Sequence, residues 1–143
     1  MNNSTSKAQF LLRLALGIGF IFPVLDRLGV LGSPGGYVVS WGNWTNFINY
    51  TNSLMPYLNR QLASFSGAVA TIGEVIFGIM LIIGLKTKWA AYGSFILTLI
   101  FALSMLFFAD YRAPFNYSVF VVSFSSLLLA TLPEHKWSVD SKF

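Results

Sequence analysis

The sequence offers few side chains that could do chemistry, and most of them lie within long apolar segments. Glu74 lies near the middle of the apolar segment 62–85, in the run TIGEVIFGIMLIIGL, and Arg13, Asp26 and Arg27 lie within the first apolar segment. A carboxylate buried in an apolar medium is unstable unless a cation or hydrogen-bond donors compensate it. Ionisable residues inside membrane segments are therefore candidate functional residues, and Glu74 is the first of them.

Spacing predicts the direction in which Glu74 points. Gly78, Leu81 and Gly84 follow it at steps of four, three and three, so all four residues share one helix face. Glycines on such a face allow a neighbouring helix to approach closely. We therefore expect Glu74 to point into a helix bundle, where it could act as a proton relay or a hydrogen-bond partner.

Arg13 is the predicted partner of Glu74. At 1.5 Å per residue, Arg13 lies roughly 8 Å deep in its segment and Glu74 roughly 16 Å deep, a gap that two long side chains or a water could close. Arg13 could equally extend its guanidinium to the lipid headgroups. Both interpretations stay open from the sequence.

Asp26 and Arg27 are expected near the outer surface. Adjacent helical residues diverge by about 100°, so the two cannot face the same neighbour. One of them is expected to meet polar side chains at the same level, which are Asn43, Arg60, Asp110, Arg112 and Asn116. The alternative is that these helix-end charges satisfy loop backbone.

The residue inventory excludes several kinds of redox and metal site. The chain has no cysteine, which excludes dithiol exchange and iron–sulfur clusters, and its one histidine, His135, cannot form a bis-histidine haem site. No metal site is predicted, and His135 is expected to be solvated in a charged tail. Ser123, Ser125 and Ser126 are expected to bond back to helix carbonyls.

The composition indicates a membrane protein. Hydrophobic residues make up 55% of the chain and charged residues only 10%, against about a quarter in soluble domains. Four segments are long enough to cross a bilayer as helices. They are residues 8–30, 62–85, 89–109 and 115–132. The prediction is a single all-α membrane domain, a four-transmembrane-helix bundle in contact with the lipid bilayer.

The distribution of lysine and arginine predicts the orientation. Lys7, Lys86, Lys88, Lys136 and Lys142 lie on the side that carries both termini, which should face the cytoplasm. The net charge of +4 is explained by these flanking residues, so no nucleic acid partner is predicted. The first segment continues into LDRLG without a clear cleavage site and is expected to be retained.

The loop 31–61 is the one long connection. Phe47, Tyr50, Thr51 and Leu54 recur at the spacing of one helix face, which predicts a short interfacial helix after Asn43. With Trp41, this aromatic segment could be a headgroup-level belt or a lid over a cavity.

Three stretches together resemble the DoxX family of small bacterial membrane proteins: RLALGIGFIFPVLDRLG, SPGGYVVSWGNWTNFINYT and GEVIFGIMLIIGLKTKWAA. The resemblance implies a four-span inner-membrane protein. Some relatives are linked to a thiosulfate:quinone oxidoreductase and others to complexes that resist oxidative stress. Arg13, Asp26, Arg27 and Glu74 fall on the family's polar positions, and Trp41 and Asn43 fall on its loop pattern.

Three functional hypotheses follow. The first is a subunit that binds a quinone or another lipophile in the bundle and associates with a redox partner subunit, with Glu74, Arg13, Asp26, Arg27, Trp41, Asn43 and Asn116 as candidate ligand or proton-relay residues. The second is a scaffold in which an ion pair locks helices together. The third is a small transporter. A homodimer is a further prediction, whereas catalysis by the chain itself is left open.

Overall fold

The computed structural model describes residues 2–142, and within that range the chain is helical without strands. Four apolar helices form the body: α1 (Asn3–Arg27), α3 (Arg60–Ile83), α4 (Thr87–Phe108) and α6 (Val119–Thr131). Three short elements complete it: α2 (Trp44–Leu54), α5 (Ala113–Asn116) and the 3-10 helix η1 (Val139–Lys142). The all-helical prediction is confirmed.

Three of these helices, α1, α3 and α4, are long and apolar enough to cross a bilayer. Helix α6 has 13 residues and spans about 20 Å, short of the roughly 30 Å of a hydrocarbon core. The predicted fourth segment, residues 115–132, is interrupted because Ser118 adopts a left-handed φ of 54° between α5 and α6. The sequence analysis did not predict this break, because residues 115–132 form an uncharged segment without a glycine or proline at position 118.

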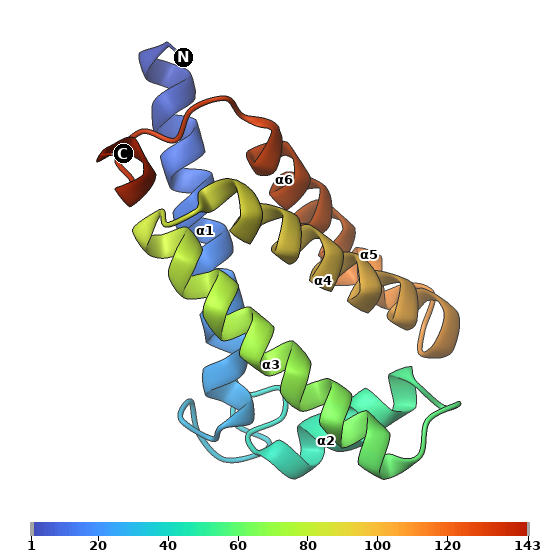
Figure 1. The fold of residues 1–143 in the computed structure, drawn as a ribbon. Coiled ribbons are helices and arrows are strands. Elements are labelled where there is room, and N and C mark those ends of the chain that lie inside the picture. Colours follow the sequence, from blue (N-terminus) through green and yellow to red (C-terminus); the bar gives the residue numbers. More distant parts are fainter. Residues whose placement is uncertain (1, 143) are drawn as a thin grey trace.

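The helices are arranged as two pairs that meet at one end of the molecule. Helix α1 packs along α3, and α4 packs along α6 (Figure 1). Both termini lie at the end where the pairs converge, which we call the terminal end. At the opposite end, the loop end, the pairs diverge and α2 lies across the bundle.

Glycines bring α1 and α3 into close contact. A Cβ on Gly17 would lie 2.9 Å from the carbonyl oxygen of Gly78, and one on Gly78 would lie 3.2 Å from that of Gly17. Gly93 of α4 plays the same role toward α3, because a Cβ there would clash with the Phe77 ring, 2.6 Å from its Cε1 atom. Gly93 thus packs within the chain.

The tail after α6 returns to the terminal end and contacts both α1 and the start of α4. The backbone N–H groups of Lys86 and Thr87, which open α4, donate to the Asp140 carboxylate at 2.6 and 2.7 Å. Helix α4 has no side-chain cap of its own, so Asp140 satisfies these two amides from a distance in sequence. Trp137 packs edge-on against Phe10 of α1 at a centroid distance of 5.7 Å.

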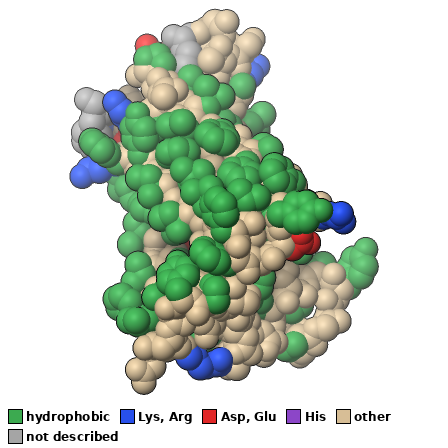
Figure 2. Space-filling model, turned by 90° about the vertical axis from the view of Figure 1, so that its right-hand side faces the viewer, with side chains coloured by type: hydrophobic (Ala, Val, Ile, Leu, Met, Phe, Trp, Pro, Cys, Tyr) green, Lys and Arg blue, Asp and Glu red, His purple; other side chains and the backbone are tan. Residues whose placement is uncertain are grey.

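The outer surface is apolar over the middle of the molecule. On the face shown in Figure 2, hydrophobic side chains cover the centre and the charged side chains lie toward the margins. Large apolar side chains such as Phe65, Ile72 and Ile79 of α3 are exposed. Such a surface needs lipid around it, as the composition predicted.

Candidate functional site

A buried ion pair joins α1 to α3. Arg27 Nη1 lies 2.6 Å from Glu74 Oε2, and Arg27 Nη2 donates to Glu74 Oε1 at 3.4 Å. The side chains are only 2% and 7% exposed. Burial of Glu74 confirms that its helix face points inward, and an ion pair this deep is stable only because each charge compensates the other.

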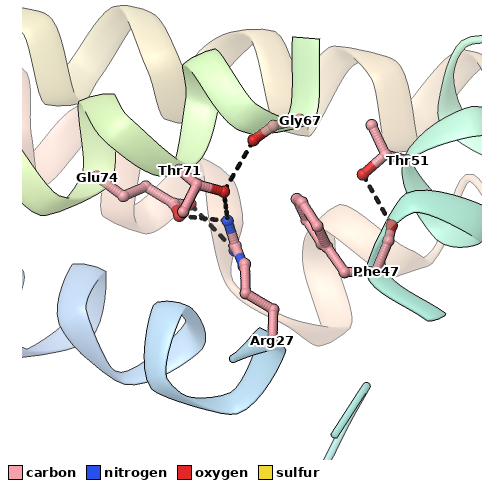
Figure 3. A network of polar contacts seen from close by, with 6 residues as sticks. All are labelled: Arg27, Phe47, Thr51, Gly67, Thr71 and Glu74. Atoms are coloured by element: carbon pink, nitrogen blue, oxygen red, sulfur yellow. Dashed lines mark hydrogen bonds and ion pairs between the residues drawn. The ribbon is translucent and has the colours of Figure 1, made fainter. Parts of the chain in front are cut away.

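A hydroxyl and two aromatic rings hold the Arg27 guanidinium in place. Nη1 donates to Thr71 Oγ1 at 2.7 Å, and that hydroxyl donates to the Gly67 carbonyl one turn earlier (Figure 3). The guanidinium lies over the Phe47 ring at 4.0 Å and over the Trp41 ring at 5.2 Å. Desolvated cation–π contacts of this kind contribute about 2 kcal/mol.

Asp26 organises the loop before α2. Its carboxylate accepts from the backbone N–H groups of Ser40, Trp41 and Gly42 at 3.1, 3.0 and 3.3 Å. Neighbouring helical residues diverge, so Asp26 reaches the loop while Arg27 reaches α3. Asp26 thereby places the Trp41 ring over Arg27.

A cavity of about 1000 Å³ lies between the two helix pairs, with α2 contributing much of its wall at the loop end. Its wall includes Arg27 and Glu74 together with apolar residues of α1, α2, α4, α5 and α6. Asn46, Asn49, Tyr50, Asn116 and Tyr117 add neutral polar groups. The volume is at the upper end of the range for small-molecule sites, and the mixture of apolar wall and few polar groups is typical of them.

Few charged side chains line this cavity. Among the residues that line it, Arg27, Glu74 and Asp110 are the ionisable charges, and the first two compensate each other. Arg27 Nε is buried and has no hydrogen-bond partner within residues 2–142. The wall therefore presents an ion pair without net charge among mainly apolar residues, which suits a neutral ligand that carries an acceptor oxygen.

Comparison with known protein families matches residues 8–108 to the DoxX family, which covers α1 to α4 and both halves of the ion pair. The chain belongs to the DoxX family. No curated protein and no solved structure matches it, so the comparison extends to the family alone.

Arg13, the predicted partner of Glu74, lies at the terminal end of this DoxX chain. Its Nη2 donates to the Trp137 carbonyl at 2.6 Å, and the side chain is buried although Nε and Nη1 lack partners within the described residues. Arg13 therefore neither pairs with Glu74 nor extends to headgroups. The sequence could not indicate these contacts, because the depth of Arg13 in its helix does not show that the C-terminal tail packs against it.

The predicted outer cluster does not form around Asp26 and Arg27. Asn43 instead caps α2 by accepting from the Asn46 N–H at 2.8 Å, and Arg60 donates to Asn49 at 2.7 Å. Asn116 lies in the cavity wall, away from the ion pair's hydrogen bonds. Of the predicted site residues, the fold brings Arg27, Glu74, Trp41 and Asn116 to one cavity.

The sequence analysis did not identify two residues that contact the Arg27 guanidinium, Thr71 and Phe47. Thr71 lies one turn before Glu74 on the same helix, so an i, i+3 search around the carboxylate would have found it. Phe47 was assigned to the helix face of α2, but nothing in the sequence linked that face to Arg27.

His135 is half-buried, contrary to the prediction of a solvated side chain. Its Nδ1 lies 3.4 Å from Gln9 Nε2 of α1. Burial lowers the pKa of His135, the nearby Asp140 carboxylate raises it and Arg13 lowers it, with a net result below the ordinary value of 6.5. Two of the three serines bond back to helix carbonyls as predicted. Ser123 donates to the Val119 carbonyl and Ser126 donates to the Val122 carbonyl.

Proposed function

We propose that this DoxX protein binds a neutral lipophile with an acceptor oxygen, a quinone-like molecule, in the cavity between the helix pairs. The observation that carries the proposal is the Arg27–Glu74 pair in the wall of an otherwise apolar cavity of about 1000 Å³. Both members of the pair line this cavity, so a ligand carbonyl or hydroxyl placed against them would meet a donor and an acceptor.

Electrons would have to come from a partner subunit. The chain has no cysteine, and residues 2–142 contain no cluster of metal-ligating side chains, so its own groups can bind, orient and exchange protons with the ligand. The proposed role is that of a membrane subunit of an oxidoreductase complex, in which the redox chemistry belongs to the bound molecule and the partner.

The proposed setting is a bacterial inner membrane, crossed four times, with both termini in the cytoplasm. Lysines at the terminal end support this orientation. The short α6 would complete its crossing together with α5 and the turn between them. The cavity then lies in the outer half of the bilayer.

Binding of decylubiquinone to the purified protein tests the proposal. Trp41 lies in the cavity wall, so binding should quench tryptophan fluorescence. Glu74→Gln should weaken binding about tenfold, which corresponds to 1.4 kcal/mol. Arg112→Gln is the matched control, because Arg112 lies at the same end but outside the cavity wall. Absence of saturable quenching in the wild type would refute the quinone proposal.

A scaffold role is the second candidate, and a specific observation favours it. Arg27 and Glu74 join α1 to α3, and the Gly17–Gly78 contact joins the same two helices nearer the terminal end, an arrangement that would lock them without any ligand. For a scaffold, Glu74→Gln should lower thermal stability in detergent while a partner's activity is unchanged once the variant has folded.

A further inference from the structure

We propose that the cavity opens sideways into the bilayer between α1 and α6, and that its ligand enters there with the hydrocarbon tail passing Gly19. The identity of the ligand rests on the proposed function, but the opening itself is argued from the packing of the two helices. The opening depends on where α1 and α6 are in contact and where they are apart.

The two helices pack together toward the terminal end. Leu16 of α1 and Leu129 of α6 belong to one buried apolar cluster. Nearer the loop end, Ala15 and Gly19 of α1 and Val119 and Val122 of α6 line the cavity together. The α1–α3 and α4–α6 pairs diverge in this direction (Figure 1), and the cavity lies where they diverge.

The α1 side of this opening is not covered by protein. Ala15 and Gly19 are one turn apart on the same face, and both are exposed although they line the cavity. A Cβ on Gly19 would meet no heavy atom within 4 Å. By contrast, the Gly17 face, two residues away, is fully occupied by α3.

Depth places this opening in hydrocarbon. Gly19 lies eight residues before Arg27, or about 12 Å along the helix, and sixteen residues after Asn3. A route at this level is reached from the acyl chains and not from water. A molecule that partitions into the bilayer could therefore place its polar head against Arg27 and Glu74, both of which are buried in the cavity wall, and leave its tail among the lipids.

Gly19 permits a test that leaves the fold intact. Since space surrounds its Cβ position, Gly19→Phe should fold and obstruct the opening. Ile18→Phe is the matched control, because Ile18 is 55% exposed on the neighbouring lipid face and does not line the cavity. Equal thermal stability of the two variants in detergent would show that the obstruction is local.

The experiment uses nanodiscs of phosphatidylcholine with a diazirine on the acyl chain, followed by irradiation and residue-resolved mass spectrometry. In the wild type and Ile18→Phe, label should appear on the interior residues Phe20 and Thr98 as well as on outward residues such as Ile96. Gly19→Phe should lose the interior label at least about fivefold and keep the outward label. Label confined to outward residues in the wild type, or interior label unaffected by Gly19→Phe, would overturn the opening.

A competition arm separates this inference from the proposed function. Decylubiquinone should reduce the interior label in the wild type if a quinone occupies the cavity. Interior label that Gly19→Phe removes but decylubiquinone does not would support the lateral opening and refute the quinone. Interior label that is absent altogether would refute the opening, even if decylubiquinone quenches Trp41.

Discussion

Arg27 and Glu74 show how a charged pair can be stable where water is excluded. Each side chain satisfies the other, Thr71 accepts a further hydrogen bond, and two aromatic rings cover the guanidinium. Removing one member leaves an uncompensated buried charge, whereas removing both can be nearly neutral. This asymmetry gives the pair a signature that can be measured.

Substituting one member of the pair should be far more harmful than substituting both. Arg27→Met is expected to destabilise the protein by about 3–5 kcal/mol, because Glu74 is then buried without a cation. Arg27→Met combined with Glu74→Leu should recover most of the loss. Thermal unfolding in detergent measures both. A double variant no more stable than the single one would contradict the assignment of the pair.

Asp26 should control the loop and not the bundle. Asp26→Asn removes the charge that accepts from three loop amides and should cost about 1–3 kcal/mol locally. Limited proteolysis should then cut residues 31–43 faster while the helices stay resistant. Asp110→Asn is the control, since Asp110 accepts only a local N–H from Arg112. Equal cleavage of both variants would argue against this role.

At the scale of elements, two glycines of α1 that lie two residues apart differ in what surrounds them: Gly17 packs against α3, whereas Gly19 has open space around it. Gly17→Ala would place a Cβ 2.7 Å from Ile82 and 2.9 Å from the Gly78 carbonyl, and should cost about 1–3 kcal/mol by forcing α1 and α3 apart. Gly19→Ala meets nothing and should gain up to about 1 kcal/mol of helix stability. Shifts of the same sign in thermal unfolding would contradict the packing described.

The tail couples α1 to the start of α4, and its titration can be followed at the one histidine of the chain. NMR of the His135 ring should give a pKa below 6.5, and Asp140→Asn should lower it further, because the Asp140 carboxylate stabilises the imidazolium. A lowered histidine pKa means that the folded state binds fewer protons than the unfolded state. Tail docking should therefore weaken as the pH falls below 6.5.

Asp140 adds a second, more acidic dependence. Burial opposes its ionisation, but hydrogen bonds from Thr87 and Lys86 outweigh burial and hold the pKa of Asp140 below 3.8. Its contribution to stability is thus complete above pH 3.8 and is lost as the pH falls through the folded-state pKa.

A His135 pKa that rises in Asp140→Asn would show that the carboxylate does not face the ring.

For the whole molecule, the arrangement of termini predicts an even number of crossings. Both termini lie at the terminal end and the loop 31–43 lies at the other (Figure 1). Because the chain has no cysteine, Ser33→Cys and Ser141→Cys give single reactive sites, and both positions are exposed. A membrane-impermeant maleimide should label position 33 in intact spheroplasts and position 141 only after lysis. Labelling of both before lysis would contradict four crossings with cytoplasmic termini.

The sequence by itself determined the solvent, the helical class and the inward face of Glu74. These follow from local properties: apolar runs of sufficient length, and residues spaced to share one side of a helix. The α2 helix was likewise predicted from the spacing of Phe47, Thr51 and Leu54, whereas the capping role of Asn43 came from the structure. Each of these inferences needs only neighbours in the chain.

Tertiary structure alone decided the partners. Glu74 pairs with Arg27 and not with Arg13. A long loop connects α1 to α3, the two helices are antiparallel, and their packing brings the side chain of residue 27 to that of residue 74. Arg13 is covered by a tail more than a hundred residues away. The cavity lies where the two helix pairs diverge, and residues of α2, far in sequence from α4 and α6, complete its wall. Register, chain return and packing are long-range properties, which spacing within a single segment does not encode.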